Sequence, residues 1–157
     1  MEYSFLKLFH VIAVLVFLGN VFTGLFWMQQ AFQSKDVKII AHTIKSVVKS
    51  DLYFTIPGVV TITFFGFIAA TNGQFPILGT GWILWSLLLF TLSGVVFMQR
   101  VVPLQKQMSK MTMELPNEQE FNWEQFSKSY QQWKFWGYVA LLAPVAAMVL
   151  MVLKVPA

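Results

Sequence analysis

Four long apolar stretches run along the chain, at about residues 4–32, 52–70, 81–102 and 135–153. A helix needs about 20 consecutive apolar residues to cross the hydrocarbon core of a bilayer, which is about 30 Å thick. The pattern therefore predicts an all-α integral membrane protein, a four-helix transmembrane bundle forming one domain over residues 1–157. Pro57 and Pro144 lie inside two of the stretches, where we expect them to kink the helices rather than end them.

Two further segments, at about residues 35–50 and 103–134, carry amphipathic helical patterns outside these stretches. Their apolar residues recur at the spacing of one helix face, and in the first segment Lys and Ser lie opposite. We expect helices two, three and four to extend into the cytoplasm and to pack there along one seam. The seam joins two apolar stripes, which are Val37, Ile40, Ile44 and Val47 against Leu104, Met108, Phe121 and Phe126.

The start of the fourth helix carries signals of its own. Asn117 has Glu120 three residues on, which is the pattern of a capping box at a helix N-terminus. Aromatic side chains gather at membrane–water interfaces because their rings are amphipathic. We expect such a belt from five residues near the base of this extension, namely Trp123, Tyr130, Trp133, Trp136 and Tyr138.

The eleven Lys and Arg residues are distributed unevenly. The first connection holds four and the third holds five, whereas the second holds none and each terminus holds one. Cytoplasmic loops of membrane proteins carry an excess of Lys and Arg. We therefore expect the two long connections in the cytoplasm and both termini on the opposite side. An acid near the start and the lack of an A-x-A-like site lead us to expect a retained first helix rather than a cleaved signal peptide.

Composition agrees with a surface that faces lipid. The chain is 57% hydrophobic and 11% charged, whereas soluble domains have about 25% charged residues. It has no cysteine, which excludes disulfides, Fe–S clusters and thiolate chemistry. It also has no H-E-x-x-H, phosphate loop or Ser/His/Asp arrangement. The pattern of residues leaves open whether the protein is an enzyme.

His10 is the main candidate for cofactor chemistry. It lies one to two turns inside helix one, and ionisable groups at membrane depth are costly and often functional. Neutral imidazole is a common axial ligand of haem iron. Lys7, one turn away, can meet a haem propionate or reach lipid headgroups. The alternative is a shallow His that hydrogen-bonds a neighbouring helix or interfacial water.

The remaining polar residues of the first two spans have structural readings as well. Asn20 falls on a stripe of small and polar residues, which serves helix packing or lines a pocket. We expect Asp51 to cap the second span or to pair with Lys or Arg. The hydroxyls of Thr55, Thr61 and Thr63 bond back to their own helix or line a polar cavity.

Two other groups of residues contain side chains of types that bind metals. His42 shares a face with Lys38, Lys45 and Lys49, and we expect this face to be solvated. Met thioethers in "MSKMTM" suit Cu(I), but Met108 and Met111 continue the apolar stripe of their helix, so we expect packing there.

Four motifs together resemble a bacterial family of small predicted integral membrane proteins of unknown function. They are "LKLFHVIAVLVFLG", "VVKSDLYFTIPGVVTITFFG", "FMQRVVPLQKQM" and "MVLKVP", and they cover most of the chain in the same order. This resemblance implies the inner membrane of a bacterium, with several spans. More distantly, the K-x-x-H, the helix-two Pro and the terminal Lys-x-Pro are similar to the HemJ-type protoporphyrinogen oxidases. Copper-resistance membrane domains are a third, weaker similarity.

The HemJ-type resemblance implies haem b bound through His10. Those proteins carry a His-and-Lys motif on the third span, whereas here "GWILWSLLLF" has neither. The resemblance therefore extends to haem binding and not to porphyrinogen oxidation.

Three functions follow from these observations. The first is a haem b or redox membrane protein, with His10 as iron ligand and Lys7 as propionate partner. The second is a non-catalytic membrane subunit or scaffold of a larger complex, and the third is copper handling. We expect the lipid bilayer as surroundings, a second copy or a membrane complex as partner, and no nucleic acid.

The charge distribution makes a prediction about topology. Reporter fusions after Asn72 and after Ala157 should report an extracytoplasmic location, and a fusion after Asn117 a cytoplasmic one. The opposite pattern would reverse the orientation of the bundle and place His10 near the cytoplasmic side.

Overall fold

The computed structural model describes residues 3–113 and 121–156, and every regular element in these ranges is helical. The α-helices are α1 (Tyr3–Ser34), α2 (Val37–Ser50), α3 (Ile56–Asn72), α4 (Gly81–Val96), α5 (Val102–Met113) and α6 (Trp123–Leu153). Two π-helical turns, η1 (Asp51–Thr55) and η2 (Phe97–Val101), join α2 to α3 and α4 to α5. The continuous helices Val37–Asn72 and Gly81–Met113 are called helix two and helix three below.

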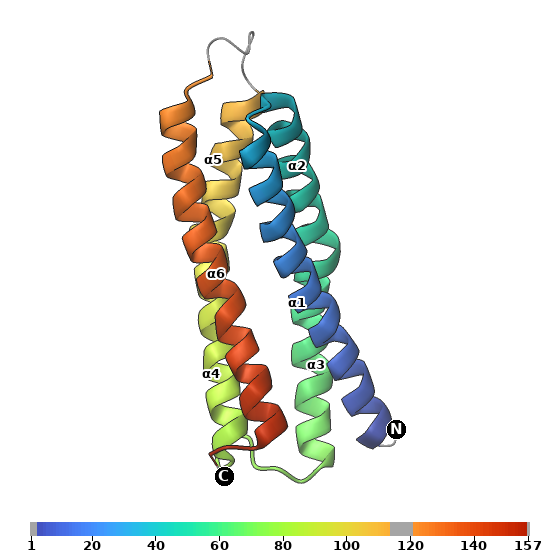
Figure 1. Ribbon diagram of the computed structural model, residues 1–157. Helices are drawn as coiled ribbons and strands as arrows, with labels where there is room; N and C mark the ends of the chain where they lie inside the picture. Colours follow the sequence, from blue (N-terminus) through green and yellow to red (C-terminus); the bar gives the residue numbers. More distant parts are fainter. Residues whose placement is uncertain (1–2, 114–120, 157) are drawn as a thin grey trace.

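Four long helices therefore form the bundle, and all four are long and apolar enough to cross a membrane. They have 31 to 36 residues, so each is about 46–54 Å long at about 1.5 Å per residue. This length exceeds the hydrocarbon thickness of about 30 Å. The two ends of the chain lie at the same end of the bundle, as four spans require (Figure 1).

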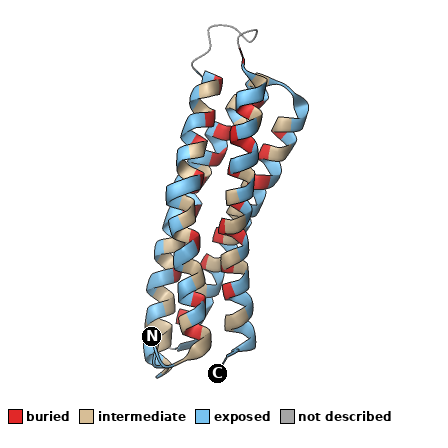
Figure 2. Ribbon diagram, turned by 90° about the vertical axis from the view of Figure 1, so that its left-hand side faces the viewer, coloured by how far each residue is buried: buried red, intermediate tan, exposed pale blue. Residues whose placement is uncertain are grey.

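The half of the bundle remote from the termini has the larger core. It is built from α2, α5 and the parts of α1 and α6 beside them, and is called the extension half. The predicted seam is confirmed, since Ile40, Ile44 and Val47 lie in one buried cluster with Met108, Phe121 and Phe126. Val37 and Leu104 pack against that cluster. Figure 2 shows buried positions along the inner faces of the helices and exposed positions outside.

Helix one also enters the extension half, which differs from the expectation that only helices two to four would do so. Met28 and Ala31 are buried in the same core, and the Phe32 ring stacks on that of Tyr130 with centroids 4.2 Å apart. The sequence "MQQAFQS" looks like the end of a span because glutamines interrupt it. The helix nevertheless continues, because its apolar side still has partners on α2 and α6.

The other half, called the apolar half, consists of two helix pairs. α1 packs on α3 and α4 packs on α6 (Figure 1). Its buried cluster is small, with Ala13, Phe17 and Ile62, and Phe90 of α4 packs against it. Two serine hydroxyls hold α4 to α6, since Ser86 donates to the carbonyl of Ala147 at 3.0 Å and Ser93 to that of Ala140 at 2.6 Å.

Each π-turn ends two residues before a proline. The N–H of Ile56 donates to the carbonyl of Asp51, five residues back, and Pro57 follows. Val102 bonds to Phe97 in the same way, and Pro103 follows. Proline lacks an N–H and its ring collides with the carbonyl four residues earlier, so a wider turn relieves the clash. The expected kink at Pro57 takes this form, whereas Pro144 lies buried inside α6 without a π-turn.

The fourth helix departs from one expectation. Tyr130 and Trp133 are 2% exposed and belong to the core, so they do not form an interfacial belt, although Tyr138 is exposed. They turn inward because they lie on the same face of α6 as Phe126.

The predicted cap pair Asn117 and Glu120 lies outside the described residues. α6 begins at Trp123, with the Asn122 side chain accepting from the N–H of Gln125 at 3.0 Å.

Ile44→Asp should destabilise the protein strongly, because Ile44 is 0% exposed in the seam and the substitution buries a charge. We expect a loss of about 3 kcal/mol or more, measured by thermal unfolding of the detergent-solubilised protein. Ile39→Asp is the matched control, since Ile39 is 47% exposed on the same helix. Equal effects of the two substitutions would contradict the seam.

Candidate functional site

Two polar residues interrupt the inward face of α1. Leu6, Ala13 and Phe17 are buried on this face at helical spacing, and His10 and Asn20 fall on the same stripe. Both are half-buried and both reach helix two. Polar groups on apolar helices need partners inside the protein, because lipid offers none. His10 and Asn20 therefore mark two candidate sites.

The ring of His10 is held by the backbone of α3. Its Nδ1 lies 2.9 Å from the carbonyl oxygen of Ile62. A carbonyl oxygen only accepts hydrogen bonds, so Nδ1 carries the hydrogen, and Nε2 of the neutral ring keeps its lone pair. This is the hydrogen bond to a neighbouring helix that the structural reading of His10 predicted. It also leaves the free nitrogen with the electronic form of a metal ligand.

Gly66 makes this approach possible. A Cβ atom at Gly66 would lie 2.9 Å from Cε1 of His10 and 3.0 Å from Nδ1, which is closer than real side chains come. The rings of Phe9 and Phe65 stack beside the site with centroids 5.2 Å apart. The role of Gly66 was not predicted. The available signal was a glycine within an apolar span, a residue type that allows close helix contact.

The other predicted site residues near the ends of the helices are exposed. Lys7 is exposed one turn before His10. His42 is exposed on α2 together with Lys45 and Lys49, so the predicted solvated face is confirmed. His42 lies in the extension half and His10 in the apolar half, so the two do not meet.

Asn20 meets a buried carboxyl group on helix two. Its Nδ2 donates to Oδ1 of Asp51 at 3.2 Å and to Oγ1 of Thr55 at 2.9 Å. Thr55 in turn donates to the same Oδ1 at 2.8 Å. Asp51 is 9% exposed and Thr55 is 3% exposed. Asn20 thus does more than pack, because it ties α1 to the first turn of η1.

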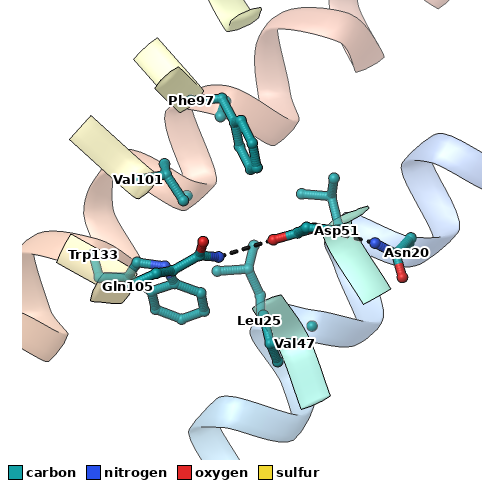
Figure 3. A pocket seen from close by; sticks show the side chains of 12 residues that line it. Asn20, Leu25, Val47, Asp51, Phe97, Val101, Gln105 and Trp133 are labelled. Carbon is teal, nitrogen blue, oxygen red and sulfur yellow. Dashed lines mark hydrogen bonds between the residues drawn. The ribbon is translucent and has the colours of Figure 1, made fainter. Parts of the chain in front are cut away.

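Helix three closes this network from the opposite side. Nε2 of Gln105, which is 3% exposed, donates to Oδ2 of Asp51 at 2.9 Å (Figure 3). The carboxyl group thus accepts from Asn20, Thr55 and Gln105, which belong to three different long helices. We call Asp51 and these three residues the Asp51 network.

The expectations for Asp51 were wrong. Asp51 caps no helix start, because helix two continues through η1, and it forms no ion pair within residues 3–113 and 121–156. Its partners are neutral because it faces the interior, where the Lys side chains of α2 do not reach. Thr55 donates to a side chain, whereas Thr61 and Thr63 bond back to their own helix at 2.8 Å as predicted.

A small cavity adjoins the Asp51 network. Its volume is about 20 Å³, room for about one water molecule. Asp51, Gln105 and Trp133 line it, with α6 contributing Gly137 and Ala140 (Figure 3). Trp133 Nε1 is buried and has no hydrogen-bond partner among the described residues. The lining therefore includes one residue with a buried carboxyl group and one residue whose indole N–H lacks an acceptor.

Gln105 and Trp133 were not predicted as site residues, although the sequence holds a signal for Gln105. It falls at helical spacing between Val101 and Met108, both buried, so a polar residue occupies a core position of helix three. Trp133 gives no such signal. The aromatic residues near it in the sequence predict only a position at a membrane–water interface.

The described residues contain no group of three or more His, Asp or Glu side chains that could hold a metal ion. Met108 is 0% exposed in the core, and Met111 packs against the same cluster, which confirms the packing reading of these thioethers.

Comparison with known proteins identifies one family. The model of the family described as "Predicted integral membrane protein (DUF2269)" matches residues 4–155. No curated protein and no solved structure matches the chain.

Gly66→Ala should loosen the contact between α1 and α3, because the new methyl group would collide with the His10 ring. We expect a loss of about 1–3 kcal/mol in the free energy of unfolding, measured by thermal unfolding in detergent. Gly19→Ala is the matched control, since nothing lies within 4 Å of a Cβ there. If Gly66→Ala were as stable as Gly19→Ala, the close approach of His10 would be wrong.

Proposed function

Because the chain belongs to the DUF2269 family of predicted integral membrane proteins, we propose that it works in the bacterial inner membrane as a haem b-binding redox protein. The observation that carries this proposal is the hydrogen bond from His10 Nδ1 to the Ile62 carbonyl. Histidines that ligate metals almost always donate their other ring N–H in this way, which sets the tautomer and raises ligand basicity.

The surroundings of His10 fit a porphyrin in their chemistry. His10 lies in the apolar half at the contact between α1 and α3, and its neighbours Phe9 and Phe65 are apolar. Lys7 is exposed one turn away and would serve as partner of a propionate. Haem bound here would supply reversible one-electron transfer, with its redox potential tuned by the His10–Ile62 hydrogen bond.

A second function, a membrane subunit or scaffold of a larger complex, is favoured by a different observation. The extension half has its own hydrophobic core, and the face of α2 with His42, Lys45 and Lys49 is exposed. Such a basic face suits an acidic partner surface. In this reading His10 is a structural residue that joins α1 to α3.

The two functions differ in the absorbance of the purified protein. Full-length protein from haem-replete cells should show a Soret band, and His10→Ala should abolish it while the protein remains folded. His42→Ala is the control, because His42 is exposed in the other half, and it should keep the band. A folded but colourless wild-type protein would refute haem binding and favour the scaffold.

A further inference from the structure

The Asp51 network has no part in the proposed role of His10. It lies on the other side of Phe17 along the inward face of α1, and it includes Gln105 of helix three. A buried, ionised carboxylate is costly unless a cation or several hydrogen bonds stabilise it. The network supplies only neutral donors, which are one amide each from Asn20 and Gln105 and the hydroxyl of Thr55.

Charged groups on the packed elements do not compensate the carboxylate. Asp51 is the one ionisable residue that lines the cavity. Lys49 on α2, Arg100 on η2 and Lys106 on α5 are exposed, and Lys134 on α6 is half-buried. Tyr130, one turn from Trp133, is titratable but packs in the core of the extension half.

Trp133 adds a second, independent observation. Its side chain is 2% exposed, and its Nε1–H, which can only donate, has no partner among the described residues. A cavity that holds about one water molecule is lined by both Trp133 and Asp51. A water there would accept from the indole and donate to the carboxylate, whereas a bare metal cation would be repelled by the N–H.

We propose that Asp51 is a proton-binding site inside the helix bundle, with a water in the cavity linking it to Trp133. On uptake, a proton leaves a hydronium ion of the solvent, passes through the cavity water and forms an O–H bond with the Asp51 carboxylate. The site changes from charged to neutral, and one water molecule remains. The new hydroxyl needs an acceptor, which Gln105 provides when its amide rotates to present Oε1.

The backbone around the site suits a change of this kind. Asp51 is the first residue of η1, and η2 ends at Val101, four residues before Gln105. π-turns within helices are frequent at functional sites. The proton-dependent hydrogen bonds thus lie beside the two places where helices two and three depart from regular α-helix.

Infrared difference spectroscopy of the full-length protein in nanodiscs, between alkaline and acidic buffer, tests the proposal. We expect the carbonyl stretch of a buried, protonated carboxyl group to appear on acidification and to be lost in Asp51→Asn. Asp36→Asn is the matched control, because Asp36 is an exposed helix cap, and it should keep the band.

Two further variants keep the test decisive if Asp51→Asn does not fold. Gln105→Leu and Trp133→Phe leave Asp51 in place but remove a partner of the carboxyl group or of its water. Each should shift the frequency or the midpoint pH of the band. An unchanged band in both variants would show that the titrating group is elsewhere, and the proposal would be wrong.

A comparison of buffers with and without sodium distinguishes a proton site from a metal-cation site. The titration should be the same in sodium and in choline buffer if the site takes a proton. A spectral change on adding sodium at constant pH would instead indicate a metal-cation site and overturn the proposal. So would a carboxyl band that does not change over the whole pH range in which the protein is folded. Neither outcome bears on the Soret band of the His10 proposal.

Discussion

The Asp51 carboxyl group is the point at which three of the four long helices are joined by directed bonds. Its partners Asn20, Thr55 and Gln105 come from helix one, helix two and helix three. Hydrophobic packing alone tolerates small rotations of one helix against another. Hydrogen bonds of 2.8–3.2 Å do not. The network therefore sets the relative rotation of these helices, and with it which residues of α1 face inward.

The two halves of the bundle differ in the forces that hold their helices together. The extension half buries a continuous core of aliphatic and aromatic side chains. We expect this half to lie in water, which drives apolar groups together. In lipid this driving force between helices is absent, and packing of small residues and hydrogen bonds take its place. The apolar half accordingly relies on close contacts at Gly58 and Gly66 and on serine hydroxyls that reach carbonyl groups of α6.

Two prolines change the local geometry of helices two and three. Pro57 and Pro103 each follow a π-turn, and the turn places one extra residue in the helix. The extra residue rotates everything beyond it by a fraction of a turn. The buried positions of helix two nevertheless form one continuous stripe, which is Ile40, Ile44, Val47, Asp51, Thr55, Gly58 and Ile62. This stripe serves both the core of the extension half and the contact with α1, since Val47 lies in that core and packs beside Gly24.

The sequence by itself determined the four apolar helices, the common side of both termini and the seam in which Ile44 and Met108 meet. Each follows from local information, because length, periodicity and hydrophobicity are properties of neighbouring residues. It also identified His10, Asn20 and Asp51 as polar residues in apolar surroundings. Only the tertiary structure decided their partners, since Asp51 and Gln105 are 54 residues apart and no local pattern pairs them. The inward turn of Trp133 was decided in the same way, because an aromatic ring suits a core as well as an interface until the facing helix is known.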